Sequence, residues 1–213
     1  MSNDLQAQFD RWAATYDADV AGGVGFPFAG YDRVLARVVE LADLTPGMAV
    51  LELGPGTGNL TAQLVERGAA VWALDFSAEM LARARARVPA AHLAQAHLLG
   101  DFPADFHRPF DRVVSTYTFH EFPLPDKLAL LRRLFAGHLR PGGAVIIGDI
   151  GFSTAVARDA VRAAAGDGWD DEYYWIMDEV EPALRTPGLI QHCELILSCA
   201  IVLALSVEQP CPE

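Results

Sequence analysis

The stretch Ala49 to Asn59 reads A-V-L-E-L-G-P-G-T-G-N, and the expected fold of the whole chain follows from it. Its apolar first half predicts a buried strand, and three glycines end that strand abruptly: Gly54, Gly56 and Gly58. Glycine has no Cβ, so it permits positive φ and lets a ligand lie directly against the backbone. A helix ending at Gly68 is expected to follow, and strand, glycine loop and helix then stand in the order of a nucleotide site.

The spacing of these glycines narrows the choice of ligand. The pattern G-x-G-x-G differs from the G-x-G-x-x-G of the dinucleotide fingerprint. An acidic residue, Glu52, stands two positions before the first glycine. The sequence E-x-G-x-G-x-G after a first strand resembles the first motif of the class I S-adenosylmethionine-dependent methyltransferases. The resemblance implies a loop around the methionine and ribose portions of the cofactor, formed by Glu52, Gly54, Gly56, Gly58 and Asn59.

Residues at the ends of the next strands extend this predicted cofactor site. A strand over residues 70–75 ends in Asp75, 21 positions after Gly54, close to the spacing of about 20 at which an acidic residue binds a ribose. A third strand is expected within residues 92–99. After it, the resemblance assigns Asp101 to the adenine amino group and Phe102 to the adenine ring, with a surface turn as the alternative. Three further cofactor contacts are predicted, namely Tyr16, Phe76 and Thr116.

The apolar patterns along the chain alternate between strands and helices, which predicts a parallel sheet with helices on both faces. Two short strands, over residues 191–197 and 201–208, are close enough for a hairpin. The segments F-D-R-V at 110–113 and R-P-G-G at 140–143 again resemble the methyltransferase family. We therefore expect an α/β fold, a doubly wound, seven-stranded, mostly parallel, Rossmann-like sheet with a C-terminal antiparallel hairpin.

The N-terminal segment is predicted to be separate from this sheet. Residues 5–20 fit one amphipathic helix, and residues 21–30 are too rich in glycine and proline for a regular element. The segment F-D-R-W-A-A-T-Y-D, residues 9–17, resembles the N-terminus of small-molecule methyltransferases, where the tyrosine closes over the cofactor. We expect a helix and flexible lid over residues 1–30 and a methyltransferase domain over 31–213. Simple core packing of Trp12 and Tyr16 is the alternative.

The segment after the fourth strand, T-Y-T-F-H-E-F-P, carries the candidate catalytic residues. His120 is the first candidate for a general base, because imidazole titrates near neutral pH, and Glu121 and Tyr117 follow. The alternative is that His120 packs or caps the loop while the acceptor loses its own proton. The acidic, aromatic run over residues 169–175 predicts either a wall of the acceptor site, open to an amine or other cationic acceptor, or a solvated loop.

Composition limits the classes of partner. The formal charge of −12, with one lysine, weighs against a nucleic-acid partner, because such affinity depends on neutralising phosphates. No apolar run approaches the roughly 20 residues of a membrane span, and the first residues lack the pattern of a signal peptide, so a cytoplasmic location without membrane contact is expected. The three cysteines form no C-x-x-C pair, and no metal site is predicted.

These patterns predict an enzyme that transfers the methyl group of S-adenosylmethionine to a small-molecule acceptor by in-line displacement. Two other classes stay open. One is a protein that binds S-adenosylmethionine without turnover, and the other is a nicotinamide-dependent oxidoreductase, which should carry G-x-G-x-x-G. The acceptor and the oligomeric state cannot be derived from the sequence.

Overall fold

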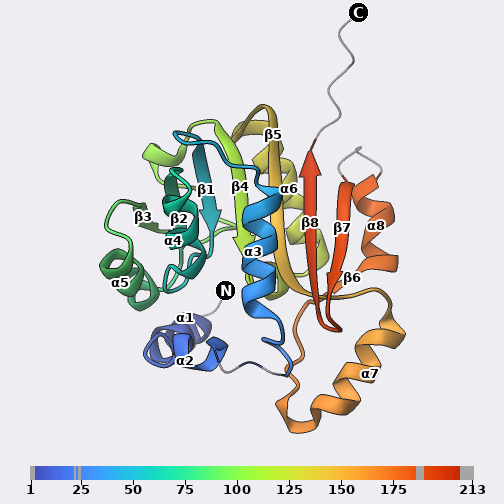
Figure 1. Cartoon of the computed structure of the whole chain (residues 1–213). Helices are drawn as coiled ribbons and strands as arrows, with labels where there is room; N and C mark the ends of the chain where they lie inside the picture. The colour runs from blue at the N-terminus through green and yellow to red at the C-terminus, as the bar shows by residue number, and fades with distance from the viewer. Residues whose placement is uncertain (1–2, 22, 24, 186–189, 207–213) are drawn as a thin grey trace, which may run out of the picture.

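The computed structural model describes residues 3–21, 23, 25–185 and 190–206, and its centre is one twisted sheet (Figure 1). Seven strands form it in the order β3-β2-β1-β4-β5-β8-β7. Their bounds are β1 Ala49–Leu53, β2 Ala70–Asp75, β3 His92–Gln95, β4 Phe110–Thr116, β5 Leu139–Phe152, β7 Ile190–Ile196 and β8 Ala200–Ser206. A two-residue strand, β6 (Trp175–Ile176), also pairs with the end of β5. The predicted doubly wound, seven-stranded sheet is therefore confirmed, with β6 as an addition.

The direction of the strands follows the prediction as well. Strands β1 to β5 pair in parallel, whereas β8 pairs antiparallel with both β5 and β7. All five residues of β1 are buried, as expected for a strand covered on both faces. Leu53 at its end is in register with Leu74 in β2 and Ser115 in β4. The carboxyl ends of β1, β2 and β4 thus meet where the strand order reverses, which is where α/β sheets bind ligands.

Helices cover both faces of the sheet through two separate apolar clusters. On one face, α3 and α4 pack through Val34, Val38 and Leu64. On the other face, α6 and α8 pack through Leu130, Leu134 and Val180. The helices are bounded as follows: α3 Tyr31–Leu41, α4 Asn59–Glu66, α5 Ala78–Arg87, α6 Leu124–Gly137, α7 Ala155–Ala165 and α8 Met177–Arg185. Short 3-10 turns lie at η1 Ala104–Phe106, η2 Phe119–Glu121 and η3 Gly166–Gly168.

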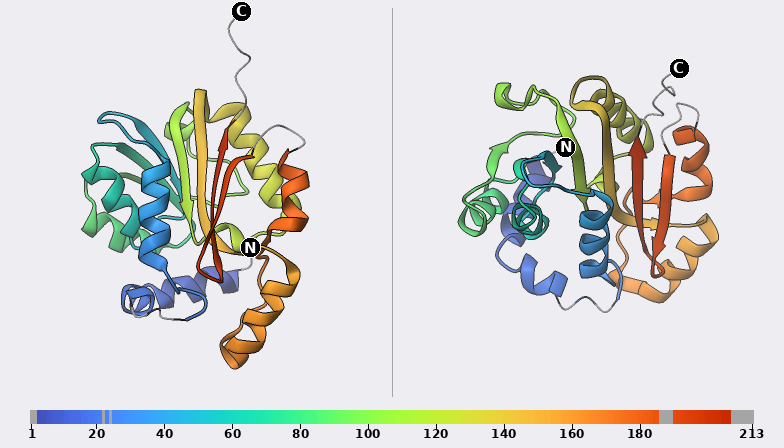
Figure 2. Two further views of the ribbon diagram at one scale, coloured as in Figure 1. Left: turned by 45° about the vertical axis from the view of Figure 1, so that its right-hand side comes forward. Right: turned by 45° about the horizontal axis from the view of Figure 1, so that its top comes forward.

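The N-terminal segment differs from the single helix predicted over residues 5–20. It forms two helices, α1 (Asn3–Trp12) and α2 (Tyr16–Ala21), with a break between them. The break arises because the side chains of Trp12 and Thr15 both donate to the Asp19 carboxylate, at 2.7 and 3.0 Å, while the Thr15 carbonyl accepts the first hydrogen bond of the new helix. Figures 1 and 2 show α1 and α2 below the carboxyl ends of the parallel strands, at the same end as α7.

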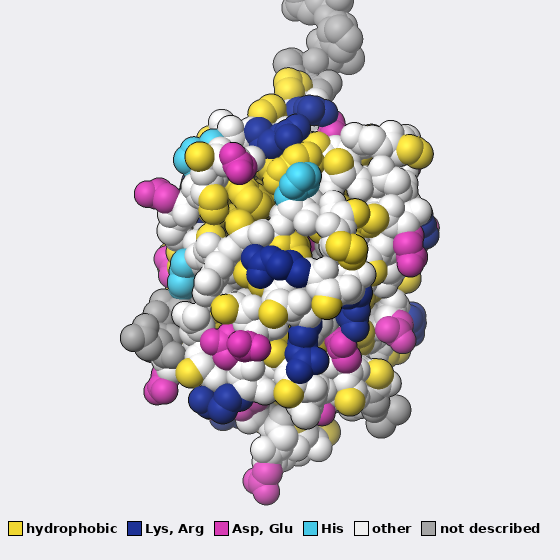
Figure 3. Space-filling model, turned by 90° about the vertical axis from the view of Figure 1, so that its left-hand side faces the viewer, with side chains coloured by type: hydrophobic (Ala, Val, Ile, Leu, Met, Phe, Trp, Pro, Cys, Tyr) yellow, Lys and Arg dark blue, Asp and Glu magenta, His cyan; other side chains and the backbone are white. Residues whose placement is uncertain are grey.

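The predicted hairpin is confirmed as β7 and β8, although the expected end of its second strand, residues 207–208, lies outside the described residues. On the face shown in Figure 3, basic side chains lie among acidic ones and form no continuous patch. The arginines of α5 are exposed. Among the helices that the structure describes, none has the length and apolarity to span a bilayer.

Candidate active site

A cavity of about 620 Å³ lies between the carboxyl ends of β1, β2 and β4 and the N-terminal helices. The glycine loop and Asp75 line one end of this cavity, and His120 and Glu121 line the other. Most of the residues predicted for the site therefore meet in one space. Those that line it are Tyr16, Gly54, Gly56, Asp75, Phe76, Thr116, Tyr117, His120 and Glu121.

The glycine loop leaves its backbone open to the cavity. Gly54 and Gly56 have φ values of +72° and +53°, which favour glycine. A Cβ at Gly54 would lie 2.1 Å from the Thr118 hydroxyl oxygen, so that side chain occupies the place of the missing Cβ. At Gly56 the nearest atom would be on the Tyr16 ring, 4.0 Å away. The backbone at Gly56 can thus be approached by a ligand from the cavity.

Asp75 is the last residue of β2, and its carboxylate orients the glycine loop. One carboxylate oxygen accepts from the Gly56 amide at 3.0 Å, and the other accepts from the Ser77 amide at 2.9 Å. Burial raises the pKa of Asp75 to about 6, and these backbone donors oppose the shift. Each oxygen retains a second lone pair for a ligand hydroxyl, because a carboxylate offers about four acceptor positions.

Glu52 lies in β1, beneath the loop and outside the lining of the cavity. One of its oxygens accepts from the Thr61 hydroxyl at 2.7 Å, and the other has no hydrogen-bond partner among the described residues. Burial raises the pKa of Glu52 to about 8, and the charge of Asp75 adds to the shift. Glu52 therefore joins the loop to α4 from within the protein and is a neutral carboxyl group at pH 7.

Asn59 and Gly58 also lie behind the cavity, where they hold neighbouring elements together. Asn59 donates to the Asp17 carboxylate in α2 and to the Tyr31 hydroxyl in α3, both at 3.2 Å. Arg87 in α5 forms an ion pair with Asp17 at 2.5 Å and also contacts Asn59. A Cβ at Gly58 would lie 3.3 Å from the backbone of α5, so glycine allows α4 and α5 to approach closely.

Aromatic rings from the N-terminal helices form the wall opposite the loop. Phe9 lies edge-on to Phe76 with ring centroids 5.1 Å apart, and Trp12 lies edge-on to Tyr16 at 4.8 Å. Burial raises the pKa of Tyr16 well above its ordinary value, so its hydroxyl stays protonated. Asp10 in α1 accepts from the Ser77 hydroxyl at 2.5 Å and joins this wall to the loop after β2. The wall therefore consists of aromatic rings, and hydrogen bonds of Asp10 in α1 and Asp17 in α2 hold it to the rest of the protein.

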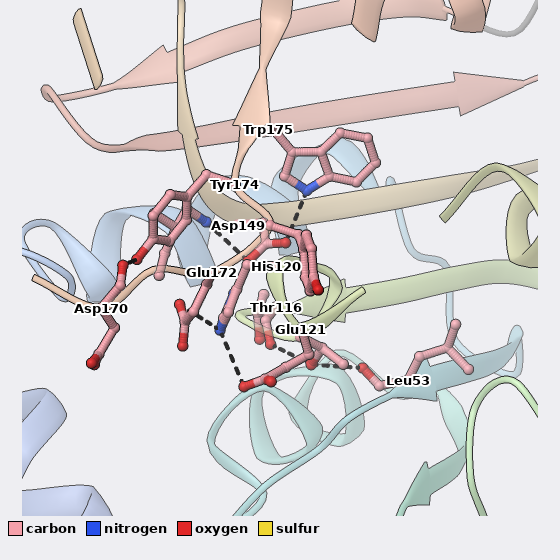
Figure 4. A network of polar contacts seen from close by, with 12 residues as sticks. Leu53, Thr116, His120, Glu121, Asp149, Asp170, Glu172, Tyr174 and Trp175 are labelled. Atoms are coloured by element: carbon pink, nitrogen blue, oxygen red, sulfur yellow. Dashed lines mark hydrogen bonds and ion pairs between the residues drawn. The ribbon is translucent and has the colours of Figure 1, made fainter. Parts of the chain in front are cut away.

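The other end of the cavity is organised by a buried carboxylate, Asp149 in β5. One of its oxygens lies 2.6 Å from Nδ1 of His120, and the other accepts from Nε1 of Trp175 at 2.9 Å (Figure 4). Burial opposes a charge on His120, but the Asp149 carboxylate outweighs this effect and raises the pKa of His120 to about 9. His120 is thereby fixed with its second nitrogen, Nε2, directed away from Asp149.

Two further carboxylates face that second nitrogen. Nε2 of His120 lies 3.8 Å from an oxygen of Glu121 and 3.8 Å from an oxygen of Glu172. Burial raises the pKa of both glutamates. Beside them, Tyr117 adopts positive φ, +50°, and burial raises the pKa of its hydroxyl far above the ordinary value. Tyr117 is thus a hydroxyl donor at neutral pH.

Comparison with known proteins identifies the family of the chain. The family model described as "Methyltransferase domain" matches residues 50–143. An uncharacterized methyltransferase of Geobacillus kaustophilus is 34% identical over 189 residues, which is 84% of this chain and 85% of the relative. The chain belongs to the methyltransferase family.

Solved structures agree with the fold of this methyltransferase. The DhpI–SAH complex superposes with a TM-score of 0.67 at 21% identity, over 95% of this chain and 94% of the other. The Haemonchus contortus phosphoethanolamine N-methyltransferase 2, in complex with S-adenosyl-L-methionine, superposes with a TM-score of 0.72 at 18% identity. The match covers 94% of this chain and 57% of the other. The class I S-adenosylmethionine-dependent methyltransferase type indicated by the sequence is confirmed.

Asp101 and Phe102 of this methyltransferase lie outside the cavity lining, although the sequence predicted them at the adenine. Asp101 is exposed, and Phe102 is buried beneath the guanidinium of Arg133, 4.3 Å from the ring centroid. Arg133 also donates to the carbonyls of Leu98 and Gly100, which holds this turn against α6. Leu98 is the residue of this turn that reaches the cavity.

Several residues of the methyltransferase site were not predicted individually. Asp149, Lys127 and Thr118 were missed, and Glu172 and Trp175 were included only in a broad acidic and aromatic run. Asp149 had a usable signal, since an acid within the apolar strand sequence A-V-I-I-G-D-I needs a buried partner. Lys127 is also buried, with its amine 4.3 Å from the Trp175 ring centroid, and burial lowers its pKa to about 8.

Proposed function

We propose that this methyltransferase transfers the methyl group of S-adenosylmethionine to a small-molecule acceptor by in-line displacement. The observation that carries the proposal is the single cavity, in which a glycine loop with Asp75 lies at one end and His120 with two glutamates lies at the other. Such a cavity has the volume of a site for a small molecule, about 300 to 1,000 Å³. The charge of −12 supports a metabolite over a nucleic acid as the acceptor. A cytoplasmic location stays a prediction.

The residues at the loop fit the cofactor. Gly56 exposes its backbone to the cavity, and Asp75 has free lone pairs for the two ribose hydroxyls. The aromatic faces of Trp12 and Tyr16 lie across the cavity, where they favour a sulfonium cation by about 0.5 to 2 kcal/mol. The solved complex of the Haemonchus contortus enzyme with S-adenosyl-L-methionine, on the same fold, supports this choice of cofactor.

The bound cofactor supplies an electrophilic methyl carbon on a positively charged sulfur. A lone pair of the acceptor forms the new bond to that carbon as the carbon–sulfur bond breaks, and an acceptor O–H or N–H then loses its proton. The main task of the protein is alignment and exclusion of water, which lowers such barriers by about 7 to 11 kcal/mol. The N-terminal helices, which we propose as the lid of the cavity, serve the exclusion of water.

Three residues are proposed to act at the acceptor. His120 is the first, because Asp149 fixes its Nδ1 and leaves Nε2 facing the glutamates. Since its pKa is raised to about 9, only the neutral fraction of His120 can accept a proton, and this fraction increases as the pH rises toward 9. Glu121, which faces the same nitrogen, is the second candidate for accepting a proton. Tyr117 is the third, because its ring lines the cavity; its buried hydroxyl has no hydrogen-bond partner among the described residues.

Cofactor binding is tested first, by calorimetric titration of the purified protein with S-adenosylmethionine and with NADH. We expect micromolar binding of S-adenosylmethionine, no binding of NADH, and loss of binding in Asp75→Ala. Binding of NADH alone would establish the oxidoreductase alternative.

Turnover is tested with a methyl-labelled cofactor and a pool of metabolites. Transfer of the label to a small molecule supports the proposal, whereas binding without transfer to any pool fraction would leave a cofactor-binding protein. With an acceptor in hand, His120→Ala is expected to lower kcat by 100-fold or more, the range of a general base. Near-normal turnover in His120→Ala would remove the base assignment.

A further inference from the structure

We propose that His120, Glu121 and Glu172 bind a divalent transition-metal ion at the acceptor end of the cavity. Each of the three offers one ligand atom, and the three atoms lie within 4.8 Å of one another. The role of the ion in holding an acceptor depends on the proposed function, whereas metal binding itself does not. In the metal-bound form Nε2 of His120 is a ligand and accepts no proton, so the ion takes the place of His120 as the group that activates the acceptor.

The spacing of the three atoms favours an ion between them. A direct hydrogen bond between an imidazole N–H and a carboxylate has a nitrogen–oxygen distance of about 2.7 to 2.9 Å. Nε2 of His120 instead lies 3.8 Å from both carboxylates, nearly equidistant and outside that range. Two ligand atoms at about 2.1 Å from a tetrahedral zinc ion lie about 3.4 Å apart. The two separations of 3.8 Å would therefore shorten by about 0.4 Å, and the two glutamate oxygens, which lie within 4.8 Å of each other, would approach by up to about 1.4 Å through rotation of their side chains.

The support behind His120 is the second, independent observation. His120 is 7% exposed, and the fully buried Asp149 lies 2.6 Å from its Nδ1. Asp149 is itself held by the Trp175 indole and the Ile150 amide, both at 2.9 Å. A carboxylate on the far nitrogen of a ligand histidine fixes the tautomer and orients the ring toward the metal. With Nδ1 held by Asp149, Nε2 is the nitrogen that faces the space between the glutamates, and an ion bound there would displace the Nε2 proton.

The third ligand comes from a distant segment that is anchored beside His120. The Tyr173 amide donates to the His120 carbonyl at 2.9 Å, and the Tyr173 carbonyl accepts from the buried Lys127. These bonds fix the backbone next to Glu172, and Figure 4 shows its carboxylate and that of Glu121 on either side of the His120 ring nitrogen. The backbone that carries Glu172 is thus held beside His120, and the glutamate side chains are left to adjust around an ion.

The ligand set indicates the type of ion and its use. One imidazole and two carboxylates suit zinc, manganese or iron(II), and three protein ligands leave a coordination position open. That position faces the cavity, because His120, Glu121 and Glu172 all line it. An oxygen or nitrogen atom of the acceptor would complete the coordination, which selects acceptors that are Lewis bases.

Metal binding is measured by calorimetry of the metal-stripped, untagged full chain with Zn²⁺, Mn²⁺ and Mg²⁺. We expect one Zn²⁺ or Mn²⁺ per chain with micromolar or tighter affinity, and at least tenfold weaker binding of Mg²⁺. His120→Ala and Glu172→Gln should each weaken binding by about 100-fold or more. The matched control is Asp171→Asn, an exposed acid that also lines the cavity and accepts from Trp169, and it should retain the affinity.

A positioning variant and a separate cofactor titration complete the test. Asp149→Asn should weaken zinc affinity by about 10- to 100-fold, as loss of a partner behind a ligand histidine does. Asp75→Asn should lose cofactor affinity and keep its metal affinity. Glu172→Gln should lose metal affinity and keep its cofactor affinity. Absence of binding, or equal affinity in Glu172→Gln and Asp171→Asn, would overturn the metal site. S-adenosylmethionine binding and methyl transfer in the same preparation would then leave the proposed function intact.

Discussion

The two ends of the cavity are built in different ways. The cofactor end is formed by one short stretch, the loop between β1 and α4, together with Asp75 at the end of the neighbouring strand. The end proposed for the acceptor joins the turn after β4, the carboxyl-terminal part of β5 and the segment before β6, with Asp149 at its centre. The first end presents mostly backbone, whereas the second presents ionisable side chains.

This difference separates two tasks of one enzyme. A cofactor of fixed chemistry is recognised by backbone geometry, which needs particular φ values and little else. The acceptor site depends instead on side chains from distant parts of the chain, each held by a further partner, as His120 is held by Asp149. We therefore expect changes at the first end to affect folding and cofactor affinity, and changes at the second to affect the acceptor and its chemistry.

The largest effect is expected for Gly54→Ala. The new Cβ would lie 2.1 Å from the Thr118 hydroxyl oxygen at a φ of +72°, so strain and overpacking add. We expect a loss of about 3 kcal/mol or more in the free energy of unfolding, measured by urea denaturation. The control is Gly47→Ala, with a φ of +89° and no atom within 4 Å of the new Cβ, which should cost only about 1 kcal/mol. Equal losses in the two variants would show that the contact with Thr118 is unimportant.

Asp75→Asn should have the next largest effect, on cofactor affinity. Hydrogen bonds to a charged acceptor contribute about 1.5 to 3 kcal/mol, so the Kd for S-adenosylmethionine should rise by about 10- to 150-fold in calorimetry. Asp101→Asn is the control, because Asp101 is exposed and lies outside the cavity lining. A similar loss in Asp101→Asn would restore the adenine contact that the sequence predicted.

Glu52→Gln should change the pH dependence of stability. The pKa of Glu52 is about 8 in the folded chain and ordinarily 4.5, so the native state binds the additional proton between these values. The wild-type chain should therefore lose about 2 kcal/mol of unfolding free energy as the pH rises from 6 to 8, and Glu52→Gln should lack this loss. Urea denaturation at the two pH values measures it. Parallel pH profiles would mean that Glu52 is ionised in the native protein.

Arg87→Ala should have the smallest effect. Its ion pair with Asp17 is 2.5 Å long, but the two side chains are 35% and 43% exposed. Such pairs contribute about 0 to 1 kcal/mol, so global stability should change little. Hydrogen exchange in α2 should become faster, because Arg87 holds that helix to α5. Arg83→Ala is the control, because Arg83 is an exposed arginine on the same helix. A loss of more than about 2 kcal/mol in the free energy of unfolding of Arg87→Ala would contradict this expectation.

The residues that we propose at the cofactor could be located from the sequence because the information that positions them is local. Gly54, Gly56 and Asp75 stand at strand ends that hydrophobic patterns identify, and parallel strands bring those ends together. Asp101 shows the limit of the same argument. It follows the third strand as predicted, but Arg133 from α6 holds the turn, and that contact is not visible in the sequence. The predicted N-terminal helix was wrong for a similar reason, since Asp19 accepts hydrogen bonds that divide it.

The sequence by itself determined the order of strands and helices, the glycine loop and the methyltransferase family, because short-range periodicity and a contiguous motif carry that information. Only the tertiary structure decided that Asp149 holds His120 and that Glu172 lies across from Glu121. Asp149 is 29 positions from His120 and Glu172 is 51 positions from Glu121, and no local sequence pattern specifies contacts over such separations. Their side chains come together because the paths of β5 and of the segment before β6 return to the end of β4.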